Sequence, residues 1–420
     1  MEELTNQCYS SIMIEEQGNW LRRELYLTKL RPLYDDCDVV KVLTGVRRCG
    51  KSVLLRQMAD ELRIQAGDDH VLDINFELTR FDGIRSAEDL DTFVTSRLAD
   101  IGTTYVFLDE IQELPDFERG INSLRARGNV SLFITGSNAH LLSGNLATYL
   151  AGRYREVRVW PLNYTEALEL QSLTGQQVAD PLQDYLTWGG MPRRFAVIGD
   201  EVQGYLRDVF NSVVLRDVVQ ATGIRDIAGL EAIVDFACEN LGRTMSPSSI
   251  AGYLRAQHRT VSVETIYSYL RALNDALLLN RVRRWDVRGK KVMATLDKYY
   301  ATDVGILTSK RVGNGPGIGD LVENAVFTHL AGRGFDMYTG TTRTGEIDFV
   351  AVKNGTPCYV QVAYLLATPE VTDREFGAFS GVHDGYPRFL ISLDPLTQDR
   401  DGVRHITLQN FLLNPPPELS

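Results

Sequence analysis

The chain has 420 residues and a net charge of −11, and its length favours two to four domains over a single one. Hydrophobic residues make up 44% and charged residues 24% of it, which is typical of globular proteins and excludes a disordered or fibrous chain. The five scattered cysteines, the acidic N-terminus and the short apolar runs argue against a disulfide framework, a signal peptide and a membrane span, so we expect a protein of the reducing cytoplasm that binds no membrane.

Within a first expected domain of residues 1–165, the sequence from Val39 to about Tyr164 alternates short β-rich apolar runs with helical stretches. This pattern is typical of a mostly parallel sheet with helices on both faces. We therefore expect an α/β domain here, of the P-loop NTPase class. The runs expected as strands are Val39–Thr44, His70–Phe76, Tyr105–Leu108, Val130–Thr135 and Glu156–Val159.

A phosphate-binding loop follows the first of these runs. Its sequence matches the pattern G-x-x-x-x-G-K-[ST] and precedes a helical stretch, as the pattern requires. In such a loop the main-chain N–H groups surround phosphates, Lys51 bridges the β- and γ-phosphates, and Ser52 is a ligand of Mg²⁺. ATP and Mg²⁺ are thus the expected cofactors. The residues expected to bind the nucleotide are Gly45, Val46, Arg47, Arg48, Cys49, Gly50, Lys51, Ser52 and Val53.

Cys49 lies within this loop at a helix start. A thiolate is favoured at such a position, and a bound nucleotide would cover it. We expect a thiol reagent to inactivate the protein and ATP to protect it.

Polar residues end the three other central strands. Asp109 and Glu110 follow the third strand, where Asp109 would hold Mg²⁺ through water and Glu110 would polarise the attacking water. Ser137 and Asn138 follow the fourth, and we expect one of them to orient that water and sense the γ-phosphate. Asn75, at the end of the second, is expected to pair with Glu110.

Helical stretches dominate residues 166–242, which we expect to form a lid or linker. In residues 243–312, helix starts at Ser246 and Ser262 precede a strand–turn–strand pattern over 281–295. Two helices and a hairpin in that order make a winged helix.

The winged-helix region is basic. Thirteen Lys and Arg against five Asp and Glu give residues 241–318 a net charge of +8, which leaves −19 for the rest of the chain. Clustered cations suit a phosphate backbone, so double-stranded DNA is one expected partner; a docked protein, or a second copy of the chain, is the other. The basic residues of the hairpin are Arg281, Arg283, Arg284, Arg288, Lys290 and Lys291.

Residues 313–420 open with a glycine-rich stretch and resemble the core of restriction-endonuclease-like folds. The resemblance rests on Glu323 in a predicted helix and on Glu346 and Asp348 in a predicted strand. In active members the next strand carries an acid, one residue and a lysine, but Gln361 and Ala363 stand there. We expect a binding or assembly module without nuclease activity, whose acids persist for structural pairing, for example with Arg343. Strands are expected at Met337–Thr339, Glu346–Val352 and Cys358–Val362.

Several ordered segments together resemble AAA+ ATPases, and in particular prokaryotic ATP-binding proteins whose C-terminal part is called domain of unknown function 4143. The resemblance implies that Arg153 reaches a γ-phosphate, its own or that of a neighbouring subunit, with Arg155 and Arg158 as rivals. The segments are Thr44–Ser52, Phe107–Gln112, Ile134–Asn138, Gly152–Tyr154 and Trp160–Leu162.

These patterns predict an Mg²⁺-dependent ATPase that couples its nucleotide state to a DNA- or protein-binding C-terminal half. The alternatives are a slow nucleotide-dependent switch or scaffold that binds protein partners, and an ATP-regulated nuclease, which would have to cleave despite Gln361 and Ala363. The expected catalytic residues are Lys51, Glu110, Asn138 and Arg153, and the expected metal ligands are Ser52 and Asp109.

Overall fold

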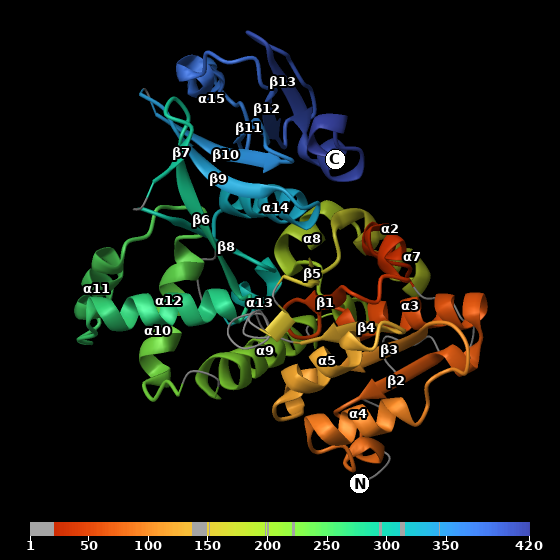
Figure 1. Ribbon diagram of the computed structural model, residues 1–420. Helices are drawn as coiled ribbons and strands as arrows, with labels where there is room; N and C mark the ends of the chain where they lie inside the picture. The colour runs from red at the N-terminus through yellow and green to blue at the C-terminus, as the bar shows by residue number, and fades with distance from the viewer. Residues whose placement is uncertain are drawn as a thin grey trace. The chain divides into compact units, whose positions relative to one another are not determined.

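The computed structural model describes residues 21–136, 149–150, 152–197, 199, 201–220, 223–293, 296–310, 316–343 and 345–420. The chain divides into two compact units, Met1–Trp160 with Asp275–Leu277, and Pro161–Asn274 with Leu278–Ser420 (Figure 1). Within the described residues, every helix is too short or too polar to cross a bilayer.

The first unit is built on a five-stranded parallel sheet in the order β2-β3-β4-β1-β5. Every residue of β1, β3 and β4 is buried, as expected for strands covered on both faces. All five strands predicted from the sequence are present, and the predicted α/β class is confirmed. The strands are β1 (Val40–Thr44), β2 (Val71–Asn75), β3 (Thr104–Asp109), β4 (Val130–Thr135) and β5 (Tyr154–Arg158).

Helices cover both faces of this sheet (Figure 1). On one face, Leu90 of α4 (Ala87–Thr95) and Ile121 of α5 (Phe117–Ala126) join one apolar core with Val106 of β3. The long helix α3 (Lys51–Ala66) packs against β2, β3 and β4 from the other side. Because the strands are parallel, their carboxyl ends lie together at one edge of the sheet, and the polar residues that end these strands lie at the same edge.

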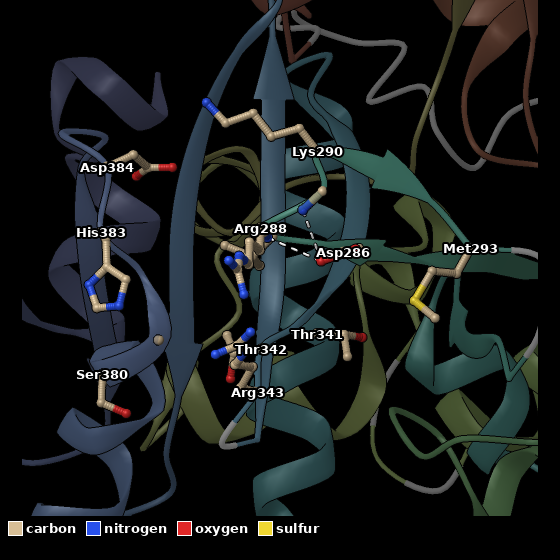
Figure 2. A pocket seen from close by; sticks show the side chains of 13 residues that line it. Asp286, Arg288, Lys290, Met293, Thr341, Thr342, Arg343, Ser380, His383 and Asp384 are labelled. Atoms are coloured by element: carbon tan, nitrogen blue, oxygen red, sulfur yellow. Dashed lines mark hydrogen bonds between the residues drawn. The ribbon is translucent and has the colours of Figure 1, made fainter.

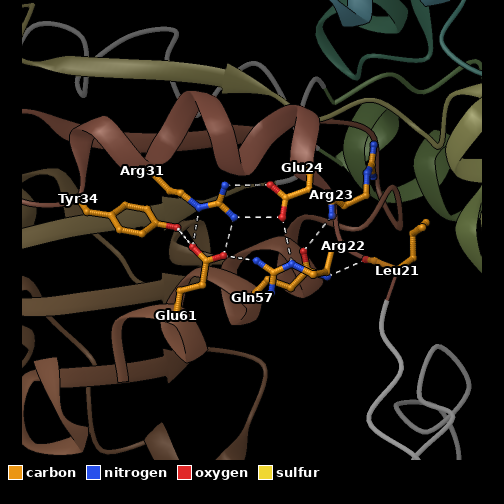
Figure 3. Close-up of polar contacts among 8 residues, drawn as sticks. All are labelled: Leu21, Arg22, Arg23, Glu24, Arg31, Tyr34, Gln57 and Glu61. Atoms are coloured by element: carbon orange, nitrogen blue, oxygen red, sulfur yellow. Dashed lines mark hydrogen bonds and ion pairs between the residues drawn. The ribbon is translucent and has the colours of Figure 1, made fainter. Parts of the chain in front are cut away.

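A network of ion pairs holds α2 (Glu24–Leu30) on α3 (Figure 3). The Arg31 guanidinium donates to Glu24 Oε2 at 2.9 Å and to Glu61 Oε1 at 2.7 Å, and the Tyr34 hydroxyl donates to Glu61 Oε2 at 3.0 Å. Burial raises the pKa of Glu61, but hydrogen bonds from Arg31, Tyr34 and Arg22 outweigh it and hold this pKa below its usual value. The network fixes α2 against the C-terminal half of α3.

The second unit begins with helices, as the sequence predicts. Ser246 caps α11, since its hydroxyl accepts the Ser249 N–H and the Ser249 hydroxyl accepts the Ser246 N–H in return. The helices are α7 (Tyr164–Thr174), α8 (Pro181–Trp188), α9 (Glu201–Ser212), which continues as a π-helix over Val213–Gln220, α10 (Ile227–Glu239), α11 (Pro247–Ala256) and α12 (Val263–Asp275).

The predicted hairpin is present but belongs to a larger sheet. Its strands β6 (Leu279–Asp286) and β7 (Lys291–Val292) pair antiparallel, and β6 also pairs in parallel with β9 (Asp336–Thr341) and antiparallel with β8 (Lys298–Ala301). A strand edge with free N–H and C=O groups favours such added pairing. The regions 243–312 and 313–420, which we expected as separate domains, thus share one sheet. Residues 313–315 of the glycine-rich stretch between them lie outside the described residues.

This sheet has eight strands in the order β13-β12-β11-β10-β9-β6-β7, with β8 beside β6. The three C-terminal strands predicted from the sequence are confirmed as β9, β10 and β11, whereas β12 and β13 were not predicted. The remaining elements are α13 (Val304–Thr308), α14 (Ile318–Gly332), β10 (Glu346–Lys353), β11 (Thr356–Val362), α15 (Pro369–Gly377), β12 (Arg388–Ser392), β13 (Val403–Thr407) and α16 (Leu408–Leu413).

Candidate functional site

The loop between β1 and α3 has the backbone that a phosphate cradle requires. Gly45 and Gly50 adopt φ of +154° and +106°, and a Cβ on Gly45 would lie 2.3 Å from the carbonyl oxygen of Val159. Gly50 offers no side chain to cap α3, so the first N–H groups of this helix can face an anion. The predicted nucleotide-binding positions 45–53 thus form one loop and the first turn of one helix.

Lys51 lies along this loop. Its Nζ donates to the carbonyl oxygens of Gly45 at 3.0 Å and Val46 at 3.4 Å, and the side chain is only 4% exposed. The ammonium group is therefore held within the cradle, where it can exchange these carbonyls for phosphate oxygens. Arg47 of the same loop pairs with Glu77, with 3.4 Å between Nη2 and Oε1.

The structure corrects the expectation for Cys49. Its side chain is fully buried, and its thiol donates to the carbonyl oxygen of Val159 at 3.3 Å. Because the thiol packs against the end of β5, Cys49 contributes its main chain to the loop. A thiol reagent should therefore label Cys49 slowly whether or not ATP is present.

Asp109 ends β3 beside the loop, as predicted. Its Oδ1 accepts from the Thr135 hydroxyl at 2.5 Å, and the Ser52 hydroxyl also donates to this carboxylate. Burial raises the pKa of Asp109, while the hydrogen bonds from Thr135 and Ser52 oppose this rise. The two predicted metal ligands are thus neighbours, and a hydroxyl beside a carboxylate is an oxygen donor set that suits Mg²⁺.

No group of three or more His, Cys, Asp or Glu in the described part of the chain could hold a metal.

Glu110 turns the chain out of β3 in a left-handed conformation, with φ 54° and ψ 46°. This conformation is uncommon for a residue other than glycine and persists only where neighbours hold it. The N–H of Glu110 donates to Thr135 Oγ1 at 2.9 Å, and its carboxylate accepts from the Gln112 amide. One hydroxyl, that of Thr135, therefore positions both acids.

Three further polar residues were predicted beside these acids, and the structure describes one of them, Asn75. Asn75 donates to Asp109 Oδ2 at 3.1 Å, so the pairing that we expected with Glu110 is wrong: β2 lies in register with β3, and Asn75 faces Asp109 directly. Ser137 and Asn138 lie outside the described residues, and the role of Asn138 stays a prediction.

The structure does not bring Arg153 to the loop of its own chain. Tyr154 pairs with Val40 at the start of β1, whereas Arg158 pairs with Thr44 at its end, next to the loop. Four residue steps of strand separate these two ends, which is about 13 Å. Arg153 is 54% exposed, with its Nε 3.8 Å from Asp38 Oδ2. A role within its own chain therefore lacks support, and a role toward a neighbouring subunit stays a prediction.

Arg158 stacks over the Trp160 ring at 4.0 Å, at the loop end of β5. Because Arg158 lies next to the phosphate loop, it remains the alternative to Arg153 as the residue that would reach the γ-phosphate within one chain.

Arg23 is a residue of the site that sequence reasoning missed. Its guanidinium donates to the carbonyl oxygens of Cys49 at 3.4 Å and Trp160 at 3.1 Å. Gln57 of α3 in turn accepts the main-chain N–H of Arg23 at 3.2 Å. Arg23 thus ties the phosphate loop to the end of β5, and no motif in the sequence marks it.

The nuclease-like acids of the second unit gather around Lys298 of β8. Its Nζ lies 2.8 Å from Glu346 Oε1, 3.3 Å from Glu323 Oε1 and 3.7 Å from Asp348 Oδ1. We expected Arg343 as a structural partner of these acids, but Lys298 and Arg284, which is 2.9 Å from Glu346, take that role. An ammonium group occupies the position between the carboxylates that a metal would need.

This cluster is buried, and Lys298 is only 6% exposed. Burial raises the pKa of Asp348 and the nearby charge of Glu323 raises it further, while Lys298 lowers it. Gln361 stands where active nucleases carry an acid, and its amide donates to Glu375 at 2.8 Å. The acids are therefore part of a structural ion cluster.

Replacing Lys298 with Met should destabilise the C-terminal sheet by roughly 3 kcal/mol or more, because it leaves buried carboxylates unpaired. Hydrogen exchange of the β10 and β11 amides measures this local stability. The pKa of Asp348 and that of Glu323 are raised in the folded chain, so without Lys298 both groups bind more protons when folded than when unfolded. The loss of stability caused by Lys298→Met should therefore be small in acid and grow as pH rises toward neutrality.

Lys310→Met is the matched control for this substitution. Lys310 pairs with Glu231 at 2.9 Å near the surface, where a lost ion pair costs about 0–1 kcal/mol. Equal effects of the two substitutions, or a deficit for Lys298→Met that does not vary with pH, would contradict the structural role of the cluster.

Two family models match parts of the chain. Residues 38–168 match an AAA domain, and residues 179–314 match a domain of unknown function, DUF8612. The first match agrees with the parallel sheet and its loop, and confirms the predicted P-loop NTPase fold of this unit. The second corrects our expectation of domain of unknown function 4143, because a different family covers the helices and hairpin of the second unit.

Solved structures resemble the chain to a limited extent. The Walker-type ATPase PABY2304 of Pyrococcus abyssi is 17% identical with a TM-score of 0.49, and the match covers 70% of this chain and 97% of that one. The ORC2 protein of Aeropyrum pernix is 13% identical with a TM-score of 0.38, over 61% of this chain and 84% of that one.

Two relatives match over most of their length. An uncharacterized protein of Methanocaldococcus jannaschii is 26% identical over 390 residues, which are 88% of this chain and 85% of the relative. An uncharacterized protein of Haemophilus influenzae is 34% identical over 400 residues, which are 94% of this chain and 98% of the relative. The chain therefore belongs to the same protein family as this uncharacterized Haemophilus influenzae protein.

Proposed function

We propose that this chain is an ATPase that binds Mg²⁺ and ATP at the loop of residues 45–53 and hydrolyses the terminal phosphoanhydride bond. One observation carries the proposal: the Thr135 hydroxyl binds Asp109 and the main chain of Glu110 together, at the strand edge that carries the phosphate loop. A loop with Lys51 alone would suit many anions. A loop with two positioned acids beside it suits a metal-bound triphosphate and an attacking water.

Each residue of the site would have a separate role in binding or hydrolysis. The main-chain N–H groups after Gly45 and Gly50 would hold the β- and γ-phosphates, and Lys51 would balance the charge that develops between them. Ser52 and Asp109 would hold Mg²⁺, which neutralises phosphate charge when it is bound. The Glu110 carboxylate would accept a hydrogen bond from the attacking water and polarise it.

The proposal is tested on the wild-type chain. Calorimetry should show binding of ATP in the presence of Mg²⁺, and phosphate release should follow with multiple turnovers. Folded protein that gives no heat with ATP and Mg²⁺ would refute the proposal. Binding without turnover would favour the slow nucleotide-dependent switch or scaffold that binds protein partners.

We further propose that hydrolysis is coupled to DNA binding by the C-terminal half. The basic stretch 241–318 supports DNA over a protein partner, because its net charge of +8 stands out in an acidic chain. A steady-state rate that rises when duplex DNA is added would support this coupling, and indifference to DNA would favour the protein-binding scaffold. The four described cysteines are free thiols, which supports the cytoplasm as the location.

A further inference from the structure

A groove of about 1050 Å³ opens in the second unit, where three segments meet. Its walls are the turn after β6, which carries Arg288 and Lys290, and the segment that carries His383; the turn after β9, with Arg343, lies between them (Figure 2). Gly381 closes the base, since a Cβ there would lie 3.0 Å from Thr342 Cβ.

The turn after β6 is held in a fixed shape. Asp286 Oδ1 accepts the N–H groups of Arg288 at 3.1 Å and Gly289 at 3.0 Å. A Cβ on Gly289 would lie 2.4 Å from Asp286 Oδ2, so a larger residue there would displace the Asp286 carboxylate. The Val287 N–H donates to the carbonyl oxygen of Thr341 at 3.1 Å, which joins this turn to the end of β9. The groove is therefore a built feature of the sheet.

Two basic residues of the hairpin outside this groove are held in ion pairs. Arg281 pairs with Asp297 at 2.6 Å, and Arg284 pairs with Glu346 at 2.9 Å. Arg288, Lys290 and Arg343 are exposed and form no ion pair with a carboxylate in the described part of the chain. Lys290 instead lies over the Tyr386 ring, with Nζ 5.1 Å from its centroid.

The two acids of the groove are already engaged within the protein. Asp286 caps its own turn, and Asp384 accepts from the Tyr359 hydroxyl at 2.8 Å and from the Tyr386 N–H at 3.4 Å. Two carboxylates that accept hydrogen bonds from the protein itself thus stand beside three cations, Arg288, Lys290 and Arg343, which line the same groove. An anionic ligand would relieve their mutual repulsion.

We propose that this groove binds the phosphate backbone of a DNA duplex. Cationic side chains with Thr and Ser hydroxyls are the groups that contact nucleic-acid phosphates. Phe, Tyr and Trp are absent from the described residues that line the groove, and His383 is the one aromatic ring among them, so the groove offers little surface on which unpaired bases can stack. It also lacks the buried aromatic anchors that dominate protein interfaces. The inference rests on the proposed DNA-binding role of the C-terminal half and is independent of ATP hydrolysis.

The test compares two charge-reversed variants of the full chain in fluorescence anisotropy with a short labelled DNA duplex, without nucleotide. Arg288→Glu with Arg343→Glu should weaken binding by about 30-fold at low salt and make the slope of log K against log salt shallower by about two. Arg283→Glu is the control on the same hairpin: Arg283 is exposed on β6, outside the groove, and should weaken binding less than about threefold. Circular dichroism melts show whether each variant is folded.

Several outcomes would overturn the proposal. They are a wild-type chain that binds no duplex, a double variant that binds like the wild type, and a loss for Arg283→Glu as large as that of the double variant. Preference for a single strand, or displacement of the duplex by polyglutamate at equal charge, would also overturn it. ATPase rates without DNA should be equal in all folded variants, so a missing ATPase activity contradicts the proposed function and leaves this binding test intact.

Discussion

Lys51→Met should lower the affinity for ATP with Mg²⁺ by about a hundredfold or more and leave no measurable hydrolysis. Lys51 is buried within the loop, and its ammonium group bonds to the carbonyl oxygens of Gly45 and Val46. Methionine keeps the length of the side chain and removes the charge, so the loss reports on the charge. Calorimetry and phosphate release measure the two effects separately.

The same substitution also removes two hydrogen bonds of the unliganded loop, so its stability must be measured. The thermal midpoint of Lys51→Met should stay within a few degrees of the wild type, because the glycine-dependent backbone of the loop remains. Lys29→Met is the matched control, since Lys29 is an exposed lysine of α2. A folded Lys51→Met variant that binds ATP as tightly as Lys29→Met would contradict the role of Lys51.

Local patterns in the sequence predicted much of the first unit. The phosphate loop and its acids were found because each depends on residues at fixed spacing beside a strand. Four of the five strands were apolar runs, whereas the charged β5 was predicted with shifted ends. The residues that position them were not found. Thr135 and Arg23 act on partners 26 residues away or more, at Asp109 and Cys49, and such pairings follow from sheet order, which a single sequence does not show.

The same limit, that a single sequence does not show sheet order, applies to the second unit. The helix cap at Ser246 and the hairpin were predicted from short-range signals. The parallel pairing of β6 with β9, in contrast, joins Arg283 to Tyr338, which lies 55 residues further along the chain. Lys298 could not be recognised as the partner of Glu323, Glu346 and Asp348, because β8 reaches them only through that sheet. Strand pairing across a sheet therefore determines which distant residues become neighbours, and local sequence patterns do not show this.

Glu110→Gln should bind ATP with Mg²⁺ nearly as tightly as the wild type and hydrolyse it about 10²- to 10⁴-fold more slowly. The N–H of Glu110 bonds to Thr135, so glutamine can keep the left-handed turn of the main chain. Glutamine also preserves the size of the side chain and removes the carboxylate that polarises water. Single-turnover hydrolysis with bound ATP measures the chemical step without product release.

Glu113→Gln is the matched control, because Glu113 is an exposed acid in the turn that follows Glu110. It should hydrolyse ATP at a rate close to that of the wild type. If Glu110→Gln turned over ATP as fast as Glu113→Gln, another group would have to polarise the water, and Asp109 could not replace it while its carboxylate is held by Thr135, Asn75 and Ser52. If Glu110→Gln keeps bound ATP unhydrolysed and Glu113→Gln does not, Glu110 is assigned as the base. Of the two variants, only Glu110→Gln removes a carboxylate beside the phosphate loop.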